Sequence, residues 1–182
     1  MISFLPLLRS EWRLLLFGFV MTFGSSFGQT YFIGLYGGDI RAELNLSHRD
    51  FGAIYSTATL VSAVLLLWSG SLIDRLDLRI YACLTAAGLS AACLLLAGSH
   101  GPLVLFLAIL ALRHLGQGLV GMAGPTAMVR YLDHHRGKAN ALSGMGYSVS
   151  EAILPSLAIA LLAVLSWRES WMVWGAALVL IA

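Results

Sequence analysis

Two charged residues lie deep inside long apolar segments of the sequence. Arg113 is the single Lys, Arg, Asp or Glu residue of Gly101–Val129, and Glu151 is the single one of Ala139–Trp167. At 1.5 Å per helical residue, Arg113 lies about 24 Å before the end of its segment, and Glu151 about 18 Å after the start of its own. In membrane-spanning helices both would be near mid-bilayer, where a lone charge costs roughly 2.5–3.5 kcal/mol. We therefore expect either substrate and proton handling or a structural Arg113–Glu151 pair, and one arrangement can serve both purposes.

Polar side chains accompany these two charges. Gln117 follows Arg113 by four residues, and Tyr147 precedes Glu151 by four, so each pair shares a helix face. An earlier apolar segment carries a further polar cluster around Gln29. Arg113 suits a substrate with an anionic group such as a carboxylate, while Glu151 is a candidate for neutralising Arg113 or carrying a coupling proton. The predicted substrate-binding residues are Gln29, Tyr31, Arg113, Gln117, Tyr147 and Glu151.

Glycine and histidine residues near these positions have a simpler interpretation. Gly121 and Gly124 continue the face of Arg113 without side chains and are better explained by close helix packing. His114 lies about 100° around the helix from Arg113, so we expect it to pack between helices.

The composition excludes a soluble protein. Of 182 residues, 59% are hydrophobic and 11% charged, whereas ordinary soluble domains carry about 25% charged residues. The mean hydropathy is +0.84. A soluble enzyme, a nucleic-acid-binding protein or a disordered tail needs charges that this sequence lacks. Cys83 and Cys93 lie in one apolar segment and indicate neither a disulfide framework nor a zinc site. We expect a polytopic membrane protein without a metal, cofactor or nucleic-acid partner.

The apolar segments have the lengths of transmembrane helices, which need about 20 residues. After a cytoplasmic or interfacial N-terminus at 1–13, a transmembrane bundle at 14–182 is predicted to contain spans at 14–36, 51–73, 80–99, 102–129, 139–165 and 170–182. The last has 13 residues and is too short to span. We interpret the chain as five complete spans and the start of a sixth, and expect an all-α membrane protein with a polytopic helical bundle.

Basic residues and helix-start patterns distinguish the two sides of this bundle. The loops on the side of the N-terminus hold seven Lys and Arg residues, and those on the other side hold three. Because cytoplasmic loops carry the excess of positive charge, the N-terminus is expected in the cytoplasm. On the opposite side, Ser47-x-x-Asp50 and Ser166-x-x-Glu169 fit a helix capping pattern. Pro102 suits the first turn of another helix.

The segment after the second span carries a motif. It reads Gly70-Ser-Leu-Ile-Asp74-Arg75-Leu-Asp77-Leu-Arg79 and resembles the loop 2–3 signature of the major facilitator superfamily, G-x-L-x-D-[RK]-x-G-[RK]-[RK]. Asp77 stands where the family has glycine, and a leucine replaces one basic residue.

The fourth span adds to this resemblance. Arg113-His-Leu-Gly116-Gln117-Gly118 is similar to the family's span-four arginine followed by Gln-Gly, with the spacing longer by one residue. Arg136-Gly-Lys-Ala before span five is also typical of the family. Spans one and four are repeat partners in that family. Each contains a Gly-Gln pair, which is a weak sequence similarity between the two repeats.

The resemblance covers the whole chain and implies twelve helices in two six-helix halves, each made of inverted three-helix repeats. This chain is then the N-terminal half, truncated within helix six. Its implied partners are a small-molecule substrate, the lipid bilayer and the missing C-terminal half, with a coupling proton as a further candidate. The resemblance also implies that the loop motif helps to latch the two halves in the outward-open state. The gating residues would be Gly70, Asp74, Arg75 and Arg79.

We therefore predict a secondary active transporter, not an enzyme, that moves a small solute by alternating access in the plasma (inner) membrane of a bacterium. The alternatives are a non-transporting membrane sensor, an inactive fragment of a transporter gene, and a natural half-transporter that dimerises. A rhomboid-type intramembrane protease also has six helices. However, Gly146-Tyr-Ser148-Val-Ser150 lacks the small residue that ends the serine motif, and 170–182 contains no histidine.

Overall fold

Four apolar helical stretches in this computed structural model, which describes residues 5–179, are long enough to cross a membrane. They are α5 (His48–Ser69) with α6 (Leu72–Arg75); α7 (Leu78–Ala97); α8 (Pro102–Leu112) with the π-helix η2 (Arg113–Val120) and α9 (Gly121–Tyr131); and η3 (Asp133–His135) with α10 (Arg136–Leu162). The described residues contain no strand. The protein is an all-α integral membrane bundle.

A column of shorter helices occupies the place of the predicted first span. After α1 (Leu5–Ser10), it consists of α2 (Trp12–Gly24), the 3-10 turn η1 (Ser25–Gly28), α3 (Thr30–Leu35) and α4 (Gly37–Glu43). Gln29 has extended backbone angles, with φ −80° and ψ 151°. This segment is therefore broken near its middle instead of forming one continuous helix. The final element is α11 (Trp167–Val179), of which 13 residues are described.

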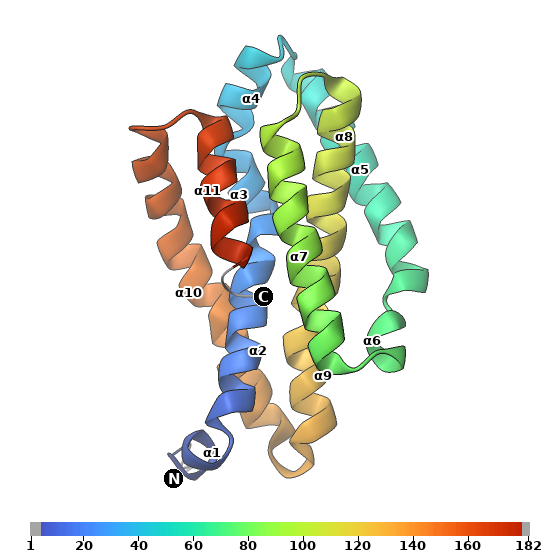
Figure 1. Ribbon diagram of the computed structural model, residues 1–182, viewed down its shortest axis with the longest axis vertical. Helices are drawn as coiled ribbons and strands as arrows, with labels where there is room; N and C mark the ends of the chain where they lie inside the picture. The colour runs from blue at the N-terminus through green and yellow to red at the C-terminus, as the bar shows by residue number, and fades with distance from the viewer. Residues whose placement is uncertain (1–4, 180–182) are drawn as a thin grey trace.

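The loops gather at two opposite ends of the bundle. α1 and the α6–α7 and α9–α10 connections lie at one end, and the α4–α5, α7–α8 and α10–α11 connections lie at the other (Figure 1). At the latter end, Ser47 and Asp50 form a reciprocal capping box. Ser166 and Glu169 exchange the same pair of bonds, and Pro102 opens α8. The three helix starts predicted from the sequence are confirmed.

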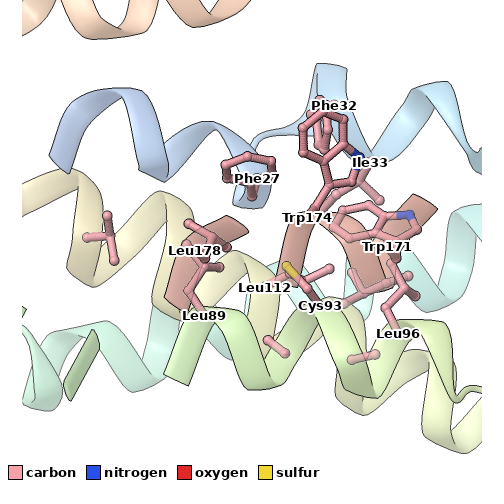
Figure 2. Packing of buried hydrophobic residues seen from close by; sticks show 14 of the residues in the cluster. Phe27, Phe32, Ile33, Leu89, Cys93, Leu96, Leu112, Trp171, Trp174 and Leu178 are labelled. Carbon is pink, nitrogen blue, oxygen red and sulfur yellow. The ribbon is translucent and has the colours of Figure 1, made fainter. Parts of the chain in front are cut away.

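Aromatic side chains fill the space between α3, α7 and α11. Trp171 and Trp174 of α11 point between Phe32 and the α7 residues that include Cys93 (Figure 2). The Trp174 indole N–H donates to Tyr36 Oη at 2.8 Å, so its polar edge is satisfied in the buried core. Because α11 thereby contacts both the column and α7, these three parts of the chain form one packed unit.

Small residues allow the column to approach α9 and α10 closely. A Cβ built on Gly146 would collide with the α2 backbone, and one on Gly124 would lie 2.7 Å from the carbonyl oxygen of Gly18. Thr22 Oγ1 also donates to the Ser143 carbonyl at 2.5 Å. The face that continues from Arg113 through Gly124 is therefore a helix-packing surface, the interpretation preferred from the sequence.

Arg168 connects three elements at the end opposite the N-terminus. Its Nε donates to Glu43 at the end of α4 at 2.8 Å. Its two Nη atoms donate to the carbonyls of Ala97, the last residue of α7, and of Ser99, each at 2.5 Å. The carbonyls at a helix C-terminus lack helical partners and attract positive charge. We call this arrangement the Arg168 clamp; it fixes the first residues of α11 against α4 and α7.

Candidate functional site

The break in the column meets the π-helical segment at a contact between two glycines. A Cβ on Gly116 would lie 2.7 Å from Cα of Gly28, and a Cβ on Gly28 would overlap the backbone around Gly116. Only glycine at both positions allows η1 and η2 to touch backbone to backbone. Two irregular helical segments thus face each other in the middle of the bundle, where backbone groups released from regular helix can bind other groups.

Arg113 binds to this break. Its Nη1 donates to the Gly28 carbonyl and to Thr30 Oγ1, each at 3.1 Å. Tyr55 of α5 donates to the same Thr30 oxygen at 3.0 Å, and the guanidinium carbon of Arg113 lies 5.5 Å from the centre of its ring. A guanidinium at this distance from an aromatic ring is attracted to the ring face. Arg113 is therefore held by a carbonyl, a hydroxyl and a ring, all uncharged.

One edge of the Arg113 guanidinium is left without a protein partner. The side chain is 7% exposed, and its buried Nε has no hydrogen-bond acceptor among the described residues. Nη2 likewise donates no bond there, whereas Nη1 already serves two acceptors. The Nε–Nη2 edge presents two parallel N–H groups, the geometry that binds a carboxylate or phosphate in bidentate fashion.

A pocket of about 280 Å³ adjoins Arg113 between α5 and η2. The polar residues that line it are Thr59 and Ser62 of α5 and Arg113 and Gln117 of η2. Thr59 Oγ1 is buried and, like Arg113 Nε, has no partner among the described residues. The pocket therefore combines a buried positive charge with hydroxyl and amide groups, which suits a small polar anion.

The pocket includes two of the predicted substrate-binding residues, Arg113 and Gln117. Gln29 is partly buried at the break, and the Tyr31 hydroxyl is buried with no partner in the described chain. Tyr147 on α10 donates to the Gly121 carbonyl at 2.9 Å, so it holds α10 against α9.

Glu151 is exposed on α10 and does not pair with Arg113. The ion pairs of the described chain are Arg130–Asp74, Arg136–Asp133 and Arg168–Glu43. The predicted Arg113–Glu151 pair is therefore wrong for this structure. The reason is geometric: the break after Gly28 places a free carbonyl and Thr30 next to Arg113, and these take its Nη1 hydrogens.

Sequence reasoning missed the contribution of α5. Tyr55, Thr59 and Ser62 follow one another at helical spacings of four and three residues and all point to the Arg113 region. This polar stripe within an apolar span is the signal that could have identified them.

Comparison with known proteins assigns the family. A family model described as the Major Facilitator Superfamily matches residues 18–182. No curated protein and no solved structure matches the chain. The chain belongs to the major facilitator superfamily. This match confirms the resemblance seen in the loop and span-four motifs. Members of this superfamily are transporters rather than enzymes.

Within this superfamily fold, spans one and four are related by an inverted repeat. The two Gly-Gln pairs, Gly28-Gln29 and Gly116-Gln117, occupy the break of the first span and the π-helix of the fourth. The contact between Gly28 and Gly116 brings these corresponding positions together. The two Gly-Gln pairs of the sequence therefore lie at the contact between η1 and η2.

The superfamily loop motif lies at the end of the bundle that carries the N-terminus. Asp74 accepts from Arg130 at the end of α9 at 3.0 Å, and Arg130 also donates to the Ile73 carbonyl at 3.2 Å. Asp77, which replaces the family glycine, caps α7 by accepting from the backbone N–H of Arg79, with an ordinary φ of −59°. The substitution is therefore compatible with the turn. Gly70 ends α5, while the side chains of Arg75 and Arg79 are exposed.

Proposed function

We propose that this transporter moves a small carboxylate-bearing solute across the membrane by alternating access, and that Arg113 binds the carboxylate. The observation that carries the proposal is the unpartnered Nε–Nη2 edge of a buried arginine beside a pocket that Thr59, Ser62 and Gln117 help to line. A buried charge without a partner is costly. An anionic substrate would supply the missing charge and two charge-assisted hydrogen bonds.

The remaining predicted residues are proposed to surround the same substrate path. Gln117 lines the pocket, and Gln29 lies at the break next to Gly28, which Arg113 binds. Tyr31 and Tyr147 are placed on the neighbouring elements α3 and α10. Glu151 is an exposed acid in the middle of α10, which makes it a candidate for exchanging a coupling proton.

The proposed partner of α5 and α10 is a C-terminal half of the same transporter. Most residues of α5 and α10 are not buried within this bundle, whereas about half of those of α7 are. α5 and α10 thus have room for a second bundle as well as lipid. We further propose a location in a bacterial plasma (inner) membrane. The seven-to-three distribution of basic residues supports a cytoplasmic N-terminus. Asp74, Arg75 and Arg79, together with Gly70, would then serve as cytoplasmic gating residues.

Transport by the complete gene product in proteoliposomes tests the proposal. Radiolabelled acetate, lactate and benzoate serve as probes, and their uncharged amides serve as controls. Arg113→Gln is expected to lower carboxylate uptake by at least about 100-fold, since it removes two charged hydrogen bonds that contribute roughly 1.5–3 kcal/mol each. Arg113→Lys keeps the charge without the planar fork and is expected to retain a small part of the uptake.

Arg49→Gln is the matched control, because Arg49 is exposed at the start of α5, away from the pocket. Its uptake should equal that of the wild type. Wild-type uptake by Arg113→Gln would reject the role of Arg113. A correctly folded wild type that transports no carboxylate would instead favour a non-transporting sensor or an inactive transporter fragment.

A further inference from the structure

We propose that the substrate is a short 2-hydroxycarboxylate, with its carboxylate on Arg113 and its hydroxyl on Thr59. This inference rests on the proposed function and narrows its substrate class. Thr59 belongs to α5 and lines, together with Arg113 of η2, the pocket of about 280 Å³ between these two elements. Ligand pockets usually measure roughly 300–1,000 Å³, so this pocket suits a small molecule.

The hydroxyl of Thr59 differs from two other hydroxyls of α5. Thr57 Oγ1 donates to the Ala53 carbonyl at 2.7 Å, and Ser69 Oγ donates to the Leu65 carbonyl at 3.0 Å. A bond to the carbonyl four residues earlier is a common local partner for a hydroxyl in a helix. Thr59 Oγ1 makes no such bond, and this buried atom has no hydrogen-bond partner among the described residues. Because a buried polar atom without a partner is costly, a ligand group that pairs with it gains affinity.

Arg113 and Thr59 line one small pocket, so a single short ligand can contact both. The ring centre of Tyr55 lies 5.5 Å from the guanidinium carbon of Arg113, and Thr59 follows Tyr55 by one helical turn, about 6 Å along the helix axis. Threonine in a helix has two favoured χ1 rotamers, so the Thr59 hydroxyl can turn toward a bound molecule. A carboxylate on the Nε–Nη2 edge of Arg113 and a hydroxyl on the adjacent carbon would match these two partners.

The charge of the pocket favours a hydroxyl over an ammonium group on that carbon. Among the described residues that line the pocket, Arg113 is the single charged one, and the other polar groups are hydroxyls and the amide of Gln117. This lining offers no carboxylate that could pair with an ammonium group, and the guanidinium repels a second positive charge. A neutral hydroxyl on the substrate avoids this repulsion and can both donate to and accept from the Thr59 hydroxyl.

Apolar side chains complete the pocket. Ala63 and Leu66 line it on α5, and Gly118 lines it on η2. A Cβ on Gly118 would lie 3.0 Å from Leu66 Cδ1, so the two elements approach closely at this point. The pocket therefore offers apolar contact to a short alkyl group, such as the methyl group of lactate.

Three compounds that differ in one substituent test this inference. Propionate, lactate and alanine carry a hydrogen, a hydroxyl and an ammonium group, respectively, on the carbon next to the carboxylate. The initial uptake of each radiolabelled compound is measured with the complete gene product in proteoliposomes. The wild type should take up lactate about tenfold faster than propionate, the effect expected when one buried hydrogen bond is lost. Alanine should be taken up most slowly of the three.

Variants of Thr59 identify the residue that recognises the hydroxyl. Thr59→Val should reduce the lactate-to-propionate ratio to about one, whereas Thr59→Ser, which keeps a hydroxyl, should retain most of the preference. Thr57→Val is the matched control, because Thr57 is exposed on the same helix and its hydroxyl is bonded to the Ala53 carbonyl. Its ratio should equal that of the wild type. Because each preference is a ratio measured within one variant, differences in the amount of folded protein cancel.

The outcomes separate this inference from the proposed function. If the wild type transports none of these compounds and neither acetate nor benzoate, the proposed function is rejected, and the hydroxyl site with it. If the wild type takes up propionate or alanine as fast as lactate, the inferred substrate class is overturned while carboxylate transport stands. A wild-type lactate-to-propionate ratio in Thr59→Val would likewise overturn the inference alone, because the hydroxyl would then be recognised elsewhere.

Discussion

Gly28 and Gly116 contact each other through their backbones, and this contact joins the broken first span to the π-helical part of the fourth. It sets the distance between the two segments that place Thr30, Gln117 and Arg113. The geometry of the proposed substrate site therefore depends on two residues that have no side chain.

An alanine at either glycine should destabilise the protein. The added Cβ would meet backbone atoms, which cannot move aside as a side chain can, and overpacking of this kind costs about 1–3 kcal/mol. Gly34→Ala is the control, because nothing lies within 4 Å of its Cβ position. Thermal unfolding in detergent should show a lower midpoint for Gly28→Ala and Gly116→Ala than for this control. Equal midpoints would mean that the contact is looser than described.

The Arg168 clamp should contribute to stability at the opposite end from the N-terminus. Arg168→Ala removes bonds to Glu43 and to two helix-terminal carbonyls, and we expect a loss of about 1–3 kcal/mol. Arg168→Lys should recover part of it, since lysine lacks the planar fork. Arg49→Ala, at an exposed position in the first turn of α5, is the control. The measurement is chemical unfolding of each variant, and a loss in Arg49→Ala as large as in Arg168→Ala would argue against the clamp.

Acid should weaken this clamp. The hydrogen bond from Arg168, followed by that from Trp167, holds the pKa of Glu43 below its ordinary value of 4.5. A carboxyl with a depressed pKa stabilises the fold above its unfolded pKa, and this contribution is lost as pH falls through the folded value. The stability difference between the wild type and Glu43→Gln should therefore be constant from pH 5 to 8 and shrink below about pH 4. A difference that grows on acidification would contradict the assignment.

Asp74 should affect transport more than stability. Its side chain is 72% exposed, and such ion pairs contribute about 0–1 kcal/mol. Asp74→Asn is therefore expected to leave the unfolding midpoint nearly unchanged. If Asp74 belongs to a gate between the two halves, the same variant should slow transport and shift the distribution between the two open states, measured by spin-label distances. Asp133→Asn, which removes the other exposed pair at this end, with Arg136, is the matched control. A wild-type distribution in Asp74→Asn would exclude the gating role.

Tyr55 should tune carboxylate affinity in two separable ways. Tyr55→Phe keeps the ring beside Arg113 but removes the bond to Thr30, and a net hydrogen bond contributes about 1 kcal/mol, or roughly fivefold in affinity. Tyr55→Leu also removes the ring and should weaken binding further. Isothermal titration with the transported carboxylate measures both. Identical affinities of the two variants would show that the ring has no direct effect on Arg113.

Hydropathy and local patterns were sufficient for the broad features of this protein. The apolar segments identify a helical membrane protein because a bilayer requires long apolar helices with satisfied backbones. The loop motif and the Arg113 motif identified the superfamily. The Ser47–Asp50 and Ser166–Glu169 caps were predictable because a capping interaction involves residues only three apart.

The partners of Arg113 were decided by tertiary structure. The sequence shows that Arg113 is at membrane depth. The prediction from sequence assumed a regular helix for every span, and on that basis Glu151 was the expected partner of Arg113. The helix break at Gln29 and the π-helix at 113–120 alter which groups face one another. The two irregular segments meet where Gly28 packs against Gly116, a contact between residues far apart in the chain. Local sequence therefore determines where the charge lies in the membrane, and the packing of spans one, two and four determines what it can bind.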